Sequence, residues 1–150
     1  MSPSEATNRA TREEWRDLGF YYETRSDPPH WLFLGSAAGL ARFVQLLDDY
    51  VADPKNRIVG EHEHYGPYGY LKIQTAEVAG IDDRSIRGSL SDLERLRDLV
   101  SERLVDSGVG QSFSIAAEYS KDTVVPLRFE VRASGFDPAS ADPHIAGTTS

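Results

Sequence analysis

The sequence predicts an α+β protein with a single antiparallel sheet and two helices packed on one face of that sheet. Two segments, 37–51 and 91–105, carry apolar residues at the spacing of one helix face, as in helices that lie on a sheet. Most of the remaining chain alternates apolar and polar residues, as strands with one buried face do. A repeat between the two helical segments indicates how the sheet is built.

The repeat is a strand–helix unit that recurs at a fixed offset. Gly35-Ser36 at the start of the first helix is repeated as Gly88-Ser89, and from position 35 to position 88 is 53 residues. The same offset places Leu40 on Leu93, at the first apolar position of each helix. The sequence therefore predicts an internal duplication, with both units contributing to one shared antiparallel sheet.

Strands are expected wherever the alternation holds. In chain order they are 19–25, 31–34, 58–65, 70–75, 85–88, 112–117 and 127–132. Ser26, Asp27 and two prolines separate the first two strands, and Gly66-Pro67-Tyr68-Gly69 favours a hairpin between 58–65 and 70–75. The polar positions of these strands should face solvent; they include Lys72, Gln74, Arg128, Glu130 and Arg132.

Each helix has residues that suit its start and its end. Ser36 can cap the first helix, and Pro54 ends it. In the second helix, Ser91 and Glu94 have the spacing of a capping box, and Gly108 follows the end. The order of elements is therefore strand, strand, helix, three strands, helix and two strands.

Length and composition indicate one globular domain. The chain has 150 residues, 39% of them hydrophobic and 27% charged. We expect a folded core at about 14–136, because the terminal segments 1–11 and 137–150 are small and polar and should be flexible. No cysteine is present, so disulfides and thiol nucleophiles are excluded.

Net charge and hydropathy limit the kinds of partner that the protein is expected to bind. The net charge of −8 argues against nonspecific nucleic-acid binding and favours either a basic partner or simply good solubility. No apolar run reaches the roughly 18 residues that cross a bilayer, and the first ten residues lack the apolar stretch of a signal peptide. We therefore expect a cytoplasmic protein without a membrane partner.

The segment 60–70, Gly-Glu-His-Glu-His-Tyr-Gly-Pro-Tyr-Gly-Tyr, is the most unusual in the chain. On a strand, His62 and His64 would share one face about 6–7 Å apart, which suits two metal ligands. A third ligand would have to come from His30, Asp82, Asp83 or Glu118, none of which stands at a diagnostic spacing. We therefore expect neither a metal nor a cofactor, and a small metal-dependent enzyme using the two histidines remains the alternative.

No complete catalytic motif is present elsewhere. The sequence lacks G-x-S-x-G, H-E-x-x-H and a glycine-rich phosphate loop. The run from Gly35 to Gly39 could hold an anion on free backbone amides at a helix start. A tight strand-to-helix turn explains the run better, because Gly88-Ser89 repeats it without the second glycine.

Tyrosines and carboxylates gather around the expected hairpin turn. Exposed tyrosines are common anchors of protein interfaces, and a frame of carboxylates suits a basic partner. The sequence thus predicts a partner-binding surface made of Glu61, Glu63, Tyr65, Tyr68, Tyr70, Asp82 and Asp83. Trp31 and Phe33, on a neighbouring strand, are instead expected in the core.

Three features appear in sequence order within residues 31–75: the run Trp31-Leu32-Phe33-Leu34-Gly35-Ser36, Gly39-Leu40 opening a helix, and a histidine-containing strand at 62–65. In this order they resemble immunity proteins that protect bacteria from polymorphic toxins. The resemblance covers under a third of the chain. It implies a small cytosolic α+β protein, not an enzyme, that neutralises a cognate toxin by stoichiometric binding. A housekeeping domain of another kind remains a further alternative.

Overall fold

The computed structural model describes residues 3–145, and positions 1–2 and 146–150 lie outside the described part. The helices are α1 (Pro3–Leu18), α2 (Ala37–Ala52) and α3 (Leu90–Val105), with short 3-10 turns η1 (Pro54–Arg57) and η2 (Pro138–Ala141). The strands are β1 (Tyr21–Ser26), β2 (Pro29–Ser36), β3 (His62–Tyr65), β4 (Leu71–Thr75), β5 (Gly80–Ile81), β6 (Ser85–Gly88), β7 (Ser112–Ile115) and β8 (Leu127–Arg132).

The strands form two sheets, which confirms the α+β class and corrects the expectation of a single antiparallel sheet. Sheet A has the order β1-β2-β8-β7 and sheet B the order β3-β4-β6-β5. In each sheet two antiparallel hairpins meet through a parallel central pair, β2 with β8 and β4 with β6. Alternation identifies the buried face of a strand but does not identify its neighbour, so the division into two sheets was not visible in the sequence.

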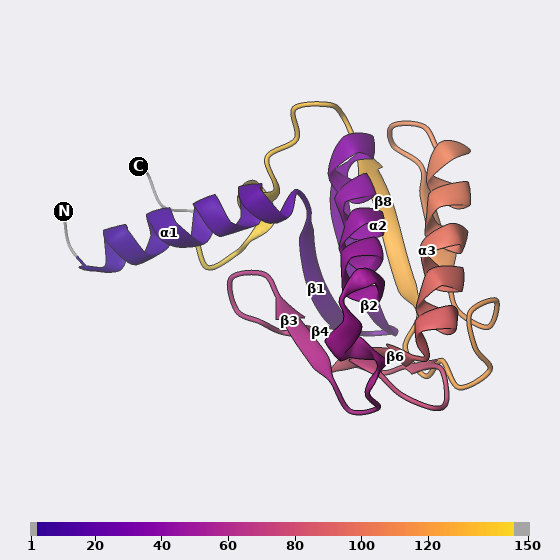
Figure 1. Cartoon of the computed structure of the whole chain (residues 1–150). Helices are drawn as coiled ribbons and strands as arrows, with labels where there is room; N and C mark the ends of the chain where they lie inside the picture. The colour runs from indigo at the N-terminus through magenta and orange to yellow at the C-terminus, as the bar shows by residue number, and fades with distance from the viewer. Residues whose placement is uncertain (1–2, 146–150) are drawn as a thin grey trace.

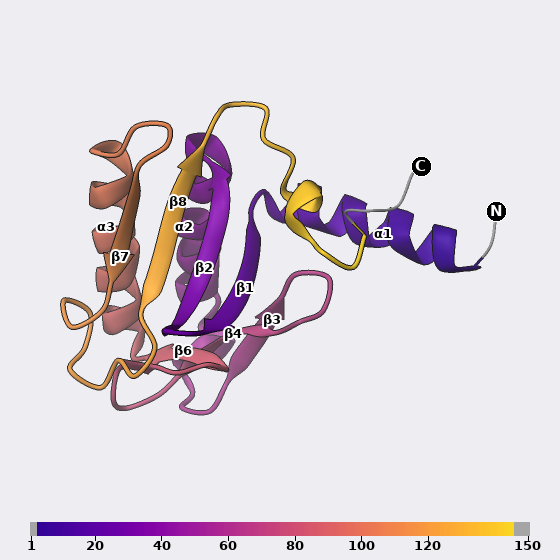
Figure 2. The ribbon, with the colours of Figure 1, turned by 180° about the vertical axis from the view of Figure 1, so that it is seen from behind.

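The two long helices α2 and α3 lie side by side in front of sheet A (Figure 1). Seen from behind, the strands of sheet A cover both helices, and sheet B closes one end of this layer (Figure 2). α2 contacts β2 and β8, whereas α3 contacts β7 and also β6 of sheet B. The prediction that both helices pack on one face of a sheet is therefore confirmed for sheet A.

In the structure the predicted repeat extends over residues 21–132. Residues 21–75 and 80–132 each run hairpin, helix, hairpin, and both bounds of α3 lie 53 residues after those of α2. Ser36 and Ser89 cap the two helices with nearly the same backbone angles, φ −64° and −68° with ψ 167° in both. Each unit gives its first hairpin to one sheet and its second hairpin to the other.

The central parallel pairs of the two sheets have equivalent register. Phe33 pairs with Phe129 in the centre of sheet A, and at the equivalent place in sheet B Ile86 pairs with Ile73. Two positions further along β2 and β6, both sheets have a glycine, Gly35 or Gly88. The molecule therefore has an approximate internal twofold symmetry that relates sheet A to sheet B.

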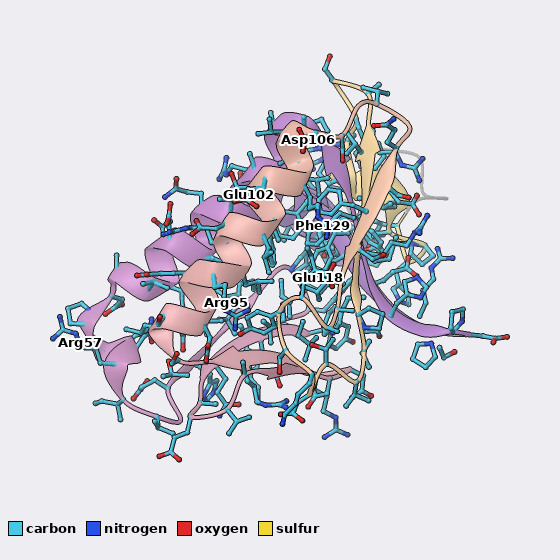
Figure 3. The ribbon with its side chains drawn as sticks, turned by 90° about the vertical axis from the view of Figure 1, so that its right-hand side faces the viewer. Arg57, Arg95, Glu102, Asp106, Glu118 and Phe129 are labelled. Atoms are coloured by element: carbon cyan, nitrogen blue, oxygen red, sulfur yellow. The ribbon has the colours of Figure 1, made fainter. Side chains whose placement is uncertain are left out.

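The core between sheet A and the helices is aromatic. The rings of Phe33 and Phe129 are stacked with centroids 4.7 Å apart, and Phe113 stacks on Phe129 at 4.9 Å. Figure 3 shows Phe129 between helices and strands, whereas Glu102 on α3 points to solvent. Trp31 is fully buried, as predicted.

The first residues of α3 and α2 differ from the sequence prediction in one respect and show why position 39 is a glycine. The capping box of α3 uses Ser89 and Asp92, two residues earlier than the expected Ser91 and Glu94, because Gly88 already ends β6 and the helix begins directly after Ser89. A Cβ at Gly39 would lie 2.3 Å from the carbonyl oxygen of Gly19. The second glycine of the run from Gly35 is thus required by close backbone packing at a tight turn.

Of the terminal segments 1–11 and 137–150 that were expected to be flexible, residues 3–11 and 137–145 are described, and they differ from that expectation; positions 1–2 and 146–150 lie outside the described residues. Residues from Pro3 form α1, and η2 contacts α1, β1 and β2. The Trp15 indole Nε1 donates to the carboxylate of Asp142 at 2.9 Å, and Ile145 is 3% exposed. These contacts join the two ends, so packing extends beyond the expected core of 14–136. Of the helices described, none combines the length and hydropathy needed to cross a bilayer.

Candidate functional site

The predicted hairpin exists and divides its side chains between two faces. β3 and β4 pair antiparallel, with His62 opposite Gln74 and His64 opposite Lys72. The two imidazole rings lie on the outer face with centroids 5.2 Å apart. Because side chains alternate along a strand, Glu61, Glu63 and Tyr65 belong to the opposite face. The residues expected to form one partner-binding surface are therefore not all on one side.

The carboxylate face of β3 is turned toward α2 and η1. Glu63 forms an ion pair with Lys55 of η1, and the Tyr50 hydroxyl of α2 donates to the backbone carbonyl of Glu61 at 2.9 Å. Tyr65 packs against the core, and this burial raises the pKa of its phenol. Glu61, Glu63 and Tyr65 thus hold the hairpin against the helix layer, and each is partly buried.

Tyr68, in the hairpin turn, connects the turn to the two chain ends. Its hydroxyl donates to the Asp142 carboxylate at 2.6 Å, and its ring meets that of Trp15 edge to face at 6.1 Å. Burial and the nearby Asp142 charge raise the pKa of the Tyr68 phenol. With 38% of its surface exposed, Tyr68 is both a structural contact and a partly open side chain.

Tyr70 is the most exposed of the three predicted tyrosines, at 68%, and it lies at the mouth of a cleft. The cleft has a volume of about 470 Å³ and lies between β1 of sheet A and the hairpin of sheet B. Its aromatic walls are Tyr22, Trp31 and Tyr70, and its charged groups include Lys72, Asp83 and Arg84. Its volume is that of a site that accepts a side chain or a small ligand.

The two aspartates expected near the hairpin have different surroundings. The Asp82 carboxylate accepts from the backbone N–H groups of Arg84 and Ser85, both at 2.8 Å, and pairs with Arg87 at 2.6 Å. Partial burial opposes ionisation of Asp82, but these donors outweigh it and lower the pKa of the carboxyl. Asp82 therefore organises the turn before β6, whereas Asp83 is exposed and lines the cleft.

Within the described part of the chain, no third metal ligand joins the histidine pair. Across residues 3–145, no three side chains of the His, Cys, Asp and Glu types come together in a group that could hold a metal ion. His30, Asp82, Asp83 and Glu118 are thus not brought to the pair as a third ligand. Glu118 instead accepts from Arg103 at 2.9 Å.

Of the predicted surface, the structure brings Tyr70 and Asp83 to one cleft, together with His64 of the metal alternative. Sequence reasoning missed the other walls, Tyr22 and Arg84, because they come from separate elements and share no spacing that would mark them. Comparison of the chain with protein-family models, with curated proteins and with solved structures found no match.

Proposed function

We propose that this chain is a cytosolic immunity protein that neutralises a basic bacterial toxin domain by stoichiometric binding at the cleft beside Tyr70. The observation that carries the proposal is Tyr70 itself, a tyrosine with 68% of its surface exposed at the edge of a 470 Å³ hollow. A large aromatic side chain beside a pocket is the arrangement of an interface anchor. The resemblance of residues 31–75 to immunity proteins supports the same conclusion.

The net charge of the whole chain favours a basic partner, whereas the charges close to Tyr70 do not favour either sign. The chain carries a net charge of −8, which steers a cationic domain toward it and speeds association. At the cleft the charges are mixed, with Asp83 beside Lys72 and Arg84. Glu61 and Glu63 on the opposite face of β3 contribute to the overall field rather than to direct contacts at Tyr70.

The test uses a toxic C-terminal domain encoded beside the gene of this chain. Coexpression with the full chain should restore growth of a bacterial host, and titration calorimetry should give one chain bound per toxin domain. Tyr70→Ala should raise Kd by about tenfold or more, mainly through faster dissociation. Val105→Ala, which truncates an exposed side chain at the end of α3, is the matched control and should leave Kd unchanged. Failure of the unmodified chain to bind that domain contradicts the proposal.

A further inference from the structure

The internal repeat allows the edges of the two sheets to be compared strand by strand. β5 is the first strand of the second unit and an edge of sheet B, just as β1 is the first strand of the first unit and an edge of sheet A. The outer edge of β5 is covered by the connector 116–126 between β7 and β8. The Ile81 carbonyl accepts from the backbone N–H of Val124 at 2.8 Å and of Val125 at 3.2 Å, and Thr123 forms a parallel bridge with Ile81.

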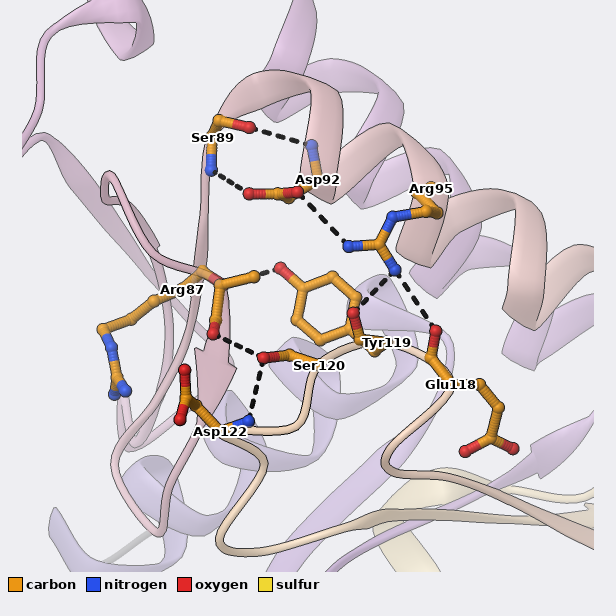
Figure 4. A network of polar contacts seen from close by, with 9 residues as sticks. Arg87, Ser89, Asp92, Arg95, Glu118, Tyr119, Ser120 and Asp122 are labelled. Carbon is orange, nitrogen blue, oxygen red and sulfur yellow. Dashed lines mark hydrogen bonds and ion pairs between the residues drawn. The ribbon is translucent and has the colours of Figure 1, made fainter.

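Side chains hold this connector firmly on sheet B (Figure 4). The Tyr119 hydroxyl donates to the Arg87 carbonyl at 2.6 Å, and the Ser120 hydroxyl donates to the Ala79 carbonyl at 2.7 Å. Arg95 of α3 donates to the Tyr119 carbonyl at 2.6 Å. The second unit therefore protects the edge of its sheet with its own connector, through residues 123–125.

The equivalent connector of the first unit is too short to do the same for β1. It comprises residues 66–70, whereas its counterpart comprises 116–126. The strands on either side of it are bonded to β1 only by a side chain: the Tyr22 hydroxyl accepts from the Leu71 N–H at 3.3 Å and donates to the Tyr65 carbonyl. Among residues 3–145, no backbone group of another segment is bonded to the outer edge of β1.

The hydrogen-bonding groups on this open edge can be assigned. The Trp31 N–H donates to the Pro126 carbonyl, so the backbone groups of Trp31 point toward β8. Thr24 is the residue opposite Trp31 on β1, and its N–H and C=O therefore point away from β2. The same holds for Tyr22, two residues earlier. The cleft is lined by both residues, and a neighbouring hollow of about 630 Å³ continues along Thr24 toward Asp27.

We propose that the outer edge of β1 accepts an extended segment of the protein partner as an additional strand of sheet A. An aliphatic side chain of that segment would enter the cleft beside the exposed Tyr70, where the buried Tyr22 and Trp31 are also lining residues, as Val125 of this chain's own connector is buried beside sheet B. Open edge strands bind extended peptides through backbone hydrogen bonds, and side-chain pockets select the sequence. The identity of the partner as a toxin rests on the proposed function, whereas the strand addition does not.

The experiment uses a capped synthetic peptide with the sequence of residues 119–126, Tyr-Ser-Lys-Asp-Thr-Val-Val-Pro, which is the type of segment that covers β5. It is added at millimolar concentration to the isotope-labelled full chain, and amide hydrogen exchange is followed by NMR. Exchange at the Thr24 amide should slow by about tenfold, because a new hydrogen bond protects it. The amides of β7, the other edge of sheet A, serve as the internal control and should not change.

Two substitutions at one position make the test specific to the backbone. Thr24→Pro removes an outward N–H and leaves the ladder to β2 intact, so peptide affinity should fall by about fivefold, which corresponds to one hydrogen bond. Thr24→Val keeps the N–H and should bind as the unmodified chain does. Equal affinity of the two variants, or an unchanged exchange rate at Thr24 in the unmodified chain, overturns strand addition.

Binding measurements with the toxin domain distinguish strand addition at β1 from the proposed function. If the toxin domain binds and Tyr70→Ala weakens it while Thr24→Pro does not, the proposed function stands and strand addition by that partner is overturned. If the peptide protects Thr24 and the toxin domain does not bind, strand addition stands and the toxin assignment is overturned.

Discussion

Asp142 is a buried carboxylate, 1% exposed, that holds together parts of the chain far apart in sequence. It accepts from the Trp15 indole at 2.9 Å, from the Tyr68 hydroxyl at 2.6 Å and from the His144 backbone N–H at 2.9 Å. Three donors compensate the loss of water around its charge. Through Asp142, α1 and the C-terminal segment support the turn that carries Tyr68.

We expect Asp142→Ala to lower the free energy of unfolding by about 2–3 kcal/mol, because the buried Trp15 indole N–H and the part-buried Tyr68 hydroxyl lose their acceptor. Urea denaturation measures the loss, and Trp15 fluorescence should shift because its indole N–H becomes unpaired. Asp83→Ala removes an exposed carboxylate with no ion pair among the described residues and should change stability by less than about 0.5 kcal/mol. Equal effects of the two substitutions would show that the Asp142 bonds do not contribute.

Single residues were predictable from sequence only where burial follows from local pattern. Trp31 lies in an apolar strand and was correctly placed in the core. The partners of Tyr68 and Tyr22 lie 74 and 43 residues away along the chain, so no local spacing marks them. The sequence therefore indicated the hairpin tyrosines as a group but did not show that Tyr70 alone would be largely exposed.

Helix starts show how much an element depends on the strand before it. In α3, the Ser89 side chain accepts from the Asp92 N–H at 3.1 Å, and the Asp92 carboxylate accepts from the Ser89 N–H at 3.0 Å. We expect Ser89→Ala to cost about 1 kcal/mol of stability in thermal or urea denaturation. Ser91→Ala, at the position first expected to cap the helix, is the control and should cost only a few tenths of a kcal/mol. The reverse ranking would contradict the assigned cap.

Elements with strong periodicity were predictable, and those without it were not. α2, α3 and the β3–β4 hairpin follow from apolar spacing and turn residues. α1 was missed because it buries few side chains, Trp15 among them, and β5 because two residues carry no pattern. The pairing of β2 with β8 joins residues about a hundred positions apart, and such pairing leaves no mark on local sequence.

At the scale of the whole molecule, carboxylates held in their charged form link stability to acid pH. Hydrogen bonds and arginine partners lower the pKa values of Asp92 and Asp137 below their usual range; for Asp92 these interactions outweigh partial burial, and for Asp137 the bond from Arg16 is the main cause. Asp82 is lowered in the same direction. Their stabilisation is therefore present above the unfolded pKa of about 4 and is lost as pH falls below it.

We expect the melting temperature, followed by circular dichroism, to be nearly constant from pH 7 to about pH 5 and to fall steeply below about pH 4. Asp92→Asn should flatten part of this fall, because the residue at position 92 then no longer titrates. Asp83→Asn is the matched control, since the Asp83 carboxyl is exposed and outside these networks. A melting temperature that rises on acidification would contradict the linkage.

The arrangement of the two sheets along the chain also determines the order in which the protein can fold during synthesis. Sheet B is made entirely of residues 62–88, so the loops between its strands are short. Its strands can pair while the rest of the chain is still being synthesised. Sheet A joins β1 and β2 near the start to β7 and β8 near the end, and it must wait until residue 132 has left the exit tunnel. Until then β2 is paired with β1 alone, its edge toward β8 is open, and Phe33 lacks the Phe129 ring that stacks on it, so the nascent chain exposes apolar surface.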